Sequence, residues 1–129
     1  MNPNALLTIA SLLSITLFIF HLADDIVVGI EQGDVNDVIG GTLICVVWLC
    51  GTLLLRGWLA GYIITILGGI LAAGVPVLHM SGKGVGGDFA KLPGAYFFIV
   101  TLLLMAVTGA FSIILSAMGL WGLQSRKSA

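Results

Sequence analysis

Long apolar runs, separated by short polar stretches, dominate the pattern of this chain. Four runs, at about residues 4–23, 38–55, 58–78 and 94–123, approach or exceed the length of about 20 mostly apolar residues that a helix needs to cross a bilayer. We therefore predict an all-α polytopic membrane protein. Its four transmembrane helices would pack as an up-down bundle and form a single domain over residues 1–129.

The composition supports a lipid environment. Hydrophobic residues make up 59% of the chain and charged residues only 9%, whereas soluble domains carry about 25% charged residues. A soluble chain of this length could not cover so much apolar surface with so few charges. We expect a multi-pass protein of the cell membrane, specifically a bacterial inner membrane. The net charge of −1 and the lack of a basic patch argue against a nucleic-acid partner.

The charges between the spans predict the orientation. With four spans, one side of the membrane holds both termini and the short connection at residue 56, and it carries three basic residues and no acid. The other side carries all six acids and only two lysines. Because basic residues gather on the cytoplasmic side, both termini are expected in the cytoplasm.

The first span ends in a cluster of ionisable residues. On a helical projection Ser11, Ser14, His21 and Asp25 fall within about 80° of arc, and Asp24 lies on the other flank of His21. Residues three and four positions apart are neighbours on a helix surface, so both carboxylates are within reach of the imidazole.

The third span carries a stripe of small residues that ends in the second histidine. Gly61, Gly68 and Ala72 lie on this stripe, and His79 is its last member. Small residues let helix backbones approach closely in lipid, so we expect these three positions in a helix–helix contact and Ile64 on a tolerant face. His79 then points into the bundle if the helix continues through Pro76.

The fourth span has a similar semi-polar stripe, made of Thr101, Met105, Thr108, Ser112, Ser116 and Gly119.

The two histidines are thus predicted at the same depth and on inward faces. Ionisable groups at membrane depth are functional candidates by default. The candidate metal or ligand site comprises His21, Asp24, Asp25, His79 and, from the glycine-rich connection 79–94, Asp88. Imidazole with carboxylate suits divalent zinc, iron, copper or nickel, and three or four ligands is the number that zinc prefers. The sequence predicts binding or movement of a metal cation or proton, and it assigns no catalytic residue.

Three alternatives stay open. His21 and His79 could be the axial ligands of a haem b group. The chain could be a non-enzymatic accessory or assembly subunit, with its small-residue faces serving a second copy or a partner membrane protein. Finally, the acids could simply form a wet outer loop, with the histidines capping helix ends.

Overall fold

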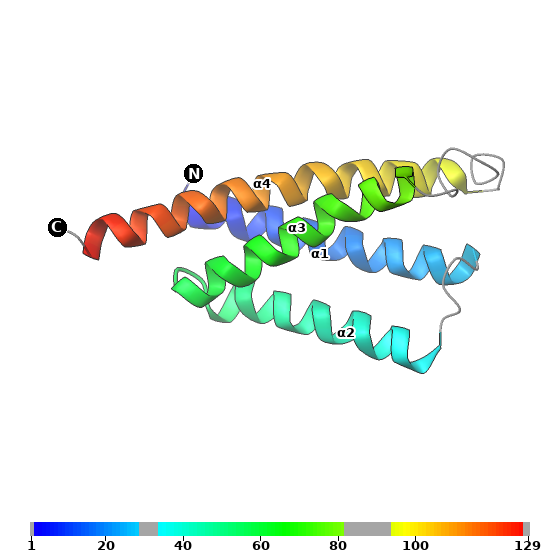
Figure 1. The fold of residues 1–129 in the computed structure, drawn as a ribbon, viewed down its shortest axis with the longest axis horizontal. Coiled ribbons are helices and arrows are strands. Elements are labelled where there is room, and N and C mark those ends of the chain that lie inside the picture. The colour runs from blue at the N-terminus through cyan, green and yellow to red at the C-terminus, as the bar shows by residue number, and fades with distance from the viewer. Residues whose placement is uncertain (1, 29–33, 82–93, 128–129) are drawn as a thin grey trace.

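A computed structural model describes residues 2–28, 34–81 and 94–127. These residues form four α-helices and one short π-helix, and no strand occurs among them (Figure 1). In chain order the elements are α1 (Pro3–Val28), α2 (Val35–Leu49), η1 (Cys50–Leu54), α3 (Leu59–Ser81) and α4 (Ala95–Lys127). The predicted all-α architecture is confirmed.

Four helical segments are long and apolar enough to span a membrane, as predicted. They are Pro3–Val27, Val35–Leu54, Leu59–His79 and Ala95–Ser125. The first differs most from the prediction, which ended it at residue 23, before the two aspartates. The helix continues because its backbone hydrogen bonds do not depend on side-chain polarity, and because Asp25 pairs with His21 one turn earlier.

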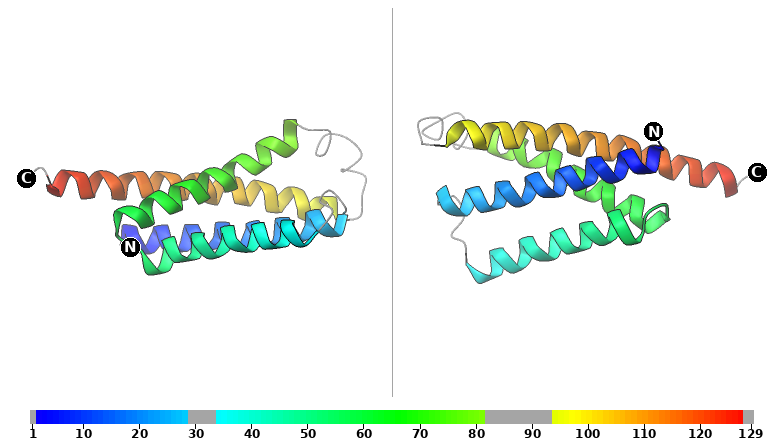
Figure 2. Two further views of the ribbon diagram at one scale, coloured as in Figure 1. Left: turned by 60° about the horizontal axis from the view of Figure 1, so that its bottom comes forward. Right: turned by 180° about the vertical axis from the view of Figure 1, so that it is seen from behind.

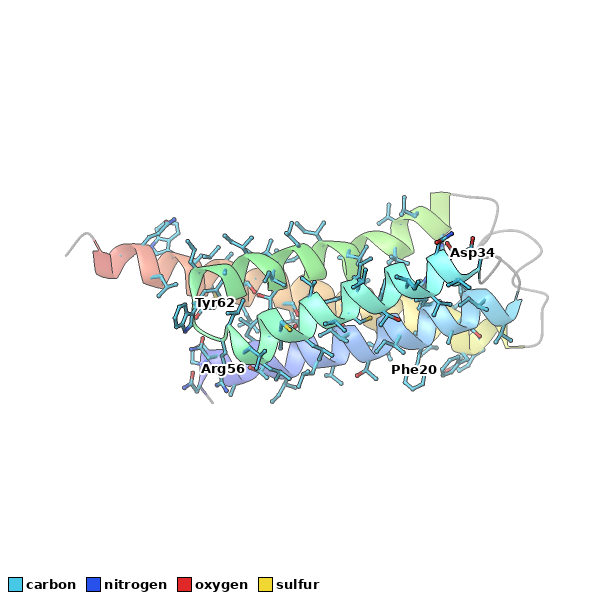
Figure 3. The ribbon with its side chains drawn as sticks, turned by 90° about the horizontal axis from the view of Figure 1, so that it is seen from below. Phe20, Asp34, Arg56 and Tyr62 are labelled. Carbon is cyan, nitrogen blue, oxygen red and sulfur yellow. The ribbon has the colours of Figure 1, made fainter. Side chains whose placement is uncertain are left out.

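The helices run alternately up and down, so α1 begins and α4 ends at the same end of the bundle (Figure 1). We call the opposite end, where His21 and His79 lie, the histidine end. Figure 3 shows the same polarity, with Arg56 and Tyr62 at the end of the termini and Asp34 at the histidine end. Placement of the termini in the cytoplasm stays a prediction, which a reporter fused to the C-terminus would test.

Helices α1, α3 and α4 make the most extensive contacts, whereas α2 is a side helix (Figure 2). Only Gly41, Cys45 and Trp48 are buried in α2, and an apolar groove of about 460 Å³ remains between α2 and α3. Large apolar side chains stay exposed on all four helices, as expected of surfaces that face lipid.

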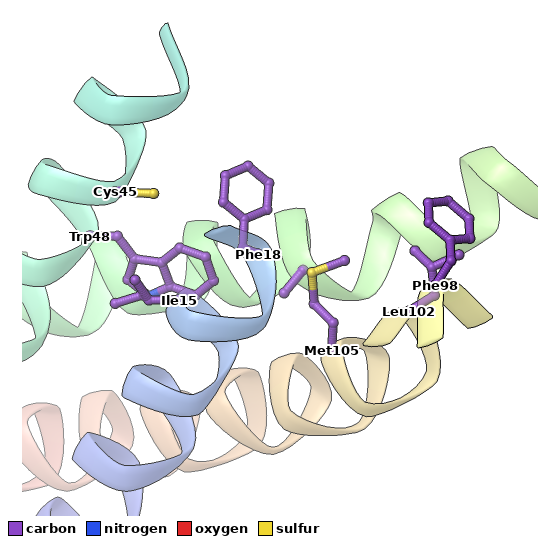
Figure 4. Packing of buried hydrophobic residues seen from close by; sticks show 8 residues of the cluster. Ile15, Phe18, Cys45, Trp48, Phe98, Leu102 and Met105 are labelled. Carbon is purple, nitrogen blue, oxygen red and sulfur yellow. The ribbon is translucent and has the colours of Figure 1, made fainter. Parts of the chain in front are cut away.

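The apolar core runs along the bundle axis (Figure 4). Its buried members come from all four α-helices and are Ile15, Phe18, Cys45, Trp48, Ala72, Phe98, Leu102 and Met105. The core therefore extends from Trp48, in the half of the bundle near the termini, to Phe98 at the histidine end.

Small residues bring the helices together at the positions of the predicted stripe. A Cβ atom added at Gly68 would collide with the ring of Trp48, and one at Gly61 would collide with the carbonyl of Leu55. Ala72 is fully buried and lies against Gly109 of α4. Ile64 is partly buried, and its side chain packs against Gly51 of the π-helix. The expected tolerance of this position to leucine stays a prediction.

A network of hydroxyl groups ties the helices together in the half near the termini. Trp48 Nε1 donates to Ser11 Oγ at 2.9 Å, and Thr52 Oγ1 donates to the carbonyl of Trp48 at 2.9 Å. Since the single hydroxyl proton of Thr52 is thereby used, the 2.7 Å bond between Ser11 and Thr52 must be donated by Ser11. The network is closed, because each of these protons has an acceptor inside the fold.

Candidate metal centre

Helix α1 supplies two of the three groups that could bind a metal ion. His21 and Asp25 are one helical turn apart, and both are buried. His21 Nε2 lies 3.2 Å from Asp25 Oδ2. The pair follows directly from the i, i+4 spacing, which places side chains over one another on a helix.

Helix α3 supplies the third group. The helix continues through Pro76, which meets the condition set by the sequence for His79 to face the bundle. His79 Nε2 lies 3.6 Å from Asp25 Oδ2, the same oxygen that His21 approaches. The His79 side chain is 20% exposed, compared with 4% for that of His21, so His79 is the more accessible side of the centre.

The two imidazoles are also in direct contact, with ring centroids 4.7 Å apart and planes tilted by 57°. The expected proximity of His21 and His79 is thus confirmed, and Asp25 lies between them. Phe98 of α4 touches both rings, at centroid distances of 5.2 Å to His21 and 5.4 Å to His79.

Not every predicted candidate joins this cluster. Asp24 is partly exposed and is not among the groups whose ligand atoms converge. Asp88 lies outside the described residues. Asp34 has a structural role, since it caps α2 by accepting a hydrogen bond from the backbone N–H of Asp37.

Phe98 was missed by sequence reasoning because a phenylalanine in an apolar span carries no chemical signal. A positional signal was present, however. Phe98 precedes Thr101 by one helical turn on the inward stripe of the fourth span, so an extension of that stripe would have found it.

The ligand atoms of His21, Asp25 and His79 all lie within 4.8 Å of one another. A tetrahedral ion with ligands at about 2.1 Å needs about 3.4 Å between them, and the observed nitrogen–oxygen separations of 3.2 and 3.6 Å bracket this value. Among the described residues, His79 Nε2, the nitrogen that approaches Asp25 Oδ2, is buried without a hydrogen-bond partner. An unpartnered polar atom is costly to bury, and a cation bound there would give this nitrogen a partner, so the donor set fits a cation.

The same geometry does not fit haem b. Axial ligands must lie on opposite faces of the porphyrin, with the macrocycle between their rings. Here the rings touch one another, and their Nε2 atoms approach one carboxylate oxygen. There is no space between them for a macrocycle.

An apolar layer separates the centre from the hydroxyl network. One and two turns away from the centre along the helices lie Phe18 of α1 and Leu102 and Met105 of α4, all buried (Figure 4). Ala72 of α3, two turns before His79, is also buried. The nearest buried hydroxyls, on Ser14 and Thr101, donate to backbone carbonyls of their own helices. Within the described residues, no hydrogen bond connects the two polar regions.

Comparisons of the chain with protein-family models, with curated proteins and with solved structures found no match.

Proposed function

We propose that this small membrane protein binds one divalent transition-metal ion through His21, Asp25 and His79. The observation that carries the proposal is the convergence of two imidazoles and one carboxylate from two helices, with ligand atoms within 4.8 Å. Ionisable groups are rare inside membrane bundles, and those that occur are commonly paired and functional.

The donor set favours zinc and its neighbours in the first transition row over magnesium and calcium. Imidazole nitrogen suits zinc, copper, nickel and iron, whereas magnesium and calcium prefer sites made entirely of oxygen. Two nitrogens and one oxygen also form the protein ligand set of a common class of zinc sites, in which a fourth position is left to water or another ligand.

The apolar layer beneath the centre supports binding and not movement of the ion through the bundle. A translocation path needs polar groups past the middle of the membrane. Beneath the centre the buried side chains are mostly apolar, Ala72 and Met105 among them, and the hydroxyl of Thr101 donates to its own helix. We therefore place the ion at one end only. If the termini are cytoplasmic, this end faces the outside of a bacterial inner membrane.

The test is metal analysis of the protein purified in mild detergent, followed by zinc titration. We expect about one zinc ion per chain. Asp25→Asn removes a charged ligand, so zinc affinity should fall by at least about 10-fold, the lower bound for losing even an indirect partner of a metal ligand.

Asp24→Asn is the matched control, because it makes the same change one residue away, outside the cluster. Its zinc affinity should equal that of the wild type. Wild-type protein that takes up no zinc, copper, nickel or iron would disprove the proposal, as would equal affinity losses in the two variants.

A further inference from the structure

Phe98 is the group on α4 that completes the contacts around the two histidines. It is 2% exposed, and its ring lies nearly parallel to that of His79, with 12° between the planes. It meets the His21 ring at 48°. Each of the three rings therefore touches the other two, at distances typical of attractive aromatic pairs.

This arrangement restricts how the imidazoles can turn. His79 is the last residue of its membrane-spanning segment, and its side chain is partly exposed. The stacked ring of Phe98, on the neighbouring helix, restricts the plane of the His79 ring. A ligand held in its binding orientation beforehand loses less conformational entropy when the ion binds.

The ring of Phe98 also acts differently on the empty and the occupied centre. An imidazole bound to a divalent cation carries part of the positive charge of that cation. Positive charge over the face of an aromatic ring is attracted by the ring quadrupole, most strongly where water is excluded. Phe98 should therefore stabilise the metal-bound state more than the metal-free state.

We infer that Phe98 is a positioning residue of the metal centre, which orients the His21 and His79 imidazoles and favours their metal-bound form. This inference rests on the proposed function, and it assigns a role in binding to α4, a helix from which none of the three ligands comes. From the strength of contacts between a cation and an aromatic ring, Phe98 should contribute about 2–30-fold to metal affinity.

The test compares Phe98 with its neighbour Phe97. Phe97 is 53% exposed and touches Phe20 at a centroid distance of 6.4 Å, away from the histidines. We would measure zinc affinity by competition with a chelating dye, and the visible spectrum of bound cobalt, which reports coordination geometry. Both are measured on the folded, monodisperse fraction of each variant.

F98L should weaken zinc binding by about 2–30-fold and shift the cobalt spectrum, because the ring that orients the imidazoles is gone. F98M, whose unbranched apolar side chain has a volume similar to that of leucine and also lacks a ring, should behave like F98L. F98Y keeps the ring and should bind zinc nearly as well as the wild type. F97L should match the wild type in both measurements.

The outcomes separate the two proposals. Failure of the wild type to bind zinc or cobalt overturns the proposed function itself. Wild-type binding together with an unchanged affinity and spectrum in F98L overturns only the role of Phe98. Equal losses in F98L and F97L, or full binding by F98M, would also overturn that role, because the effect would then not depend on a ring at this position.

Discussion

The bundle contains two buried polar regions, and they are built in opposite ways. Near the termini, Trp48, Ser11 and Thr52 form a closed network in which each proton has an acceptor within the fold. At the histidine end, His79 Nε2, which approaches Asp25 Oδ2, has no hydrogen-bond partner among the described residues. A closed network needs nothing further and holds helices together, whereas donor atoms left over after folding are suited to an added ion.

The nature of the polar groups explains the difference. A hydroxyl in a helix can donate to a carbonyl one turn earlier and accept from a neighbouring helix, so it is easily satisfied inside the membrane. An ionised carboxylate has no proton to donate to such a carbonyl, so its partner inside the membrane must be another polar side chain or a cation. Asp25 approaches His21 on its own helix and His79 on α3, and these are the three groups whose ligand atoms converge.

The contrast between the closed hydroxyl network and the histidine cluster would be lost if the histidines were not needed for metal binding. His21→Ala and His79→Ala should each reduce zinc affinity by more than about 100-fold, because removal of a ligand exceeds the loss of an indirect partner. Metal content after gel filtration provides the measurement. Ser14→Ala, which alters a fully buried hydroxyl on the same helix as His21, is the control and should retain its metal.

A second test concerns the helix contact that supports the hydroxyl network. Gly68→Leu should destabilise the fold by about 1–3 kcal/mol or more, because the new side chain would displace the buried Trp48 ring. Thermal unfolding in detergent measures the change. The control is Gly74→Leu on the same helix, where an added Cβ meets no atom within 4 Å. Equal tolerance at the two glycines would contradict the close packing of α2 on α3.

The smallest expected effect is that of Ser11→Ala, which tests whether the hydroxyl network and the histidine end are independent of each other. Ser11→Ala removes an acceptor for Trp48 and a donor for Thr52, and it should lower stability by about 1 kcal/mol, since hydrogen bonds between membrane helices average about 0.6 kcal/mol. Zinc affinity should not change. Thr16→Ala, at an exposed hydroxyl that bonds only to its own helix, should leave both quantities unaltered. A loss of zinc binding in Ser11→Ala would show that the two regions are coupled.

Several features follow from the sequence alone. Apolar runs of sufficient length predict four spanning helices because an unpaired backbone group is too costly in lipid for any other form of these segments. Helix geometry also predicts that His21 has a carboxylate partner on its own helix, since spacings of three and four residues bring both Asp24 and Asp25 within reach of the imidazole. The inward face of His79 was predictable from the small residues on its stripe.

The tertiary structure decided the rest. Asp24 and Asp25 are adjacent in sequence, and both are within reach of His21 on an isolated helix. Only the approach of α3 selects Asp25, by bringing His79 to within 3.6 Å of its Oδ2 atom. Likewise, the packing of α4 places Phe98 against both imidazoles, while the direct contact of the two rings leaves no room for haem. The sequence determined what each helix presents on its faces, but the angles and depths at which the helices cross depend on how all their side chains pack together. No single segment contains that information.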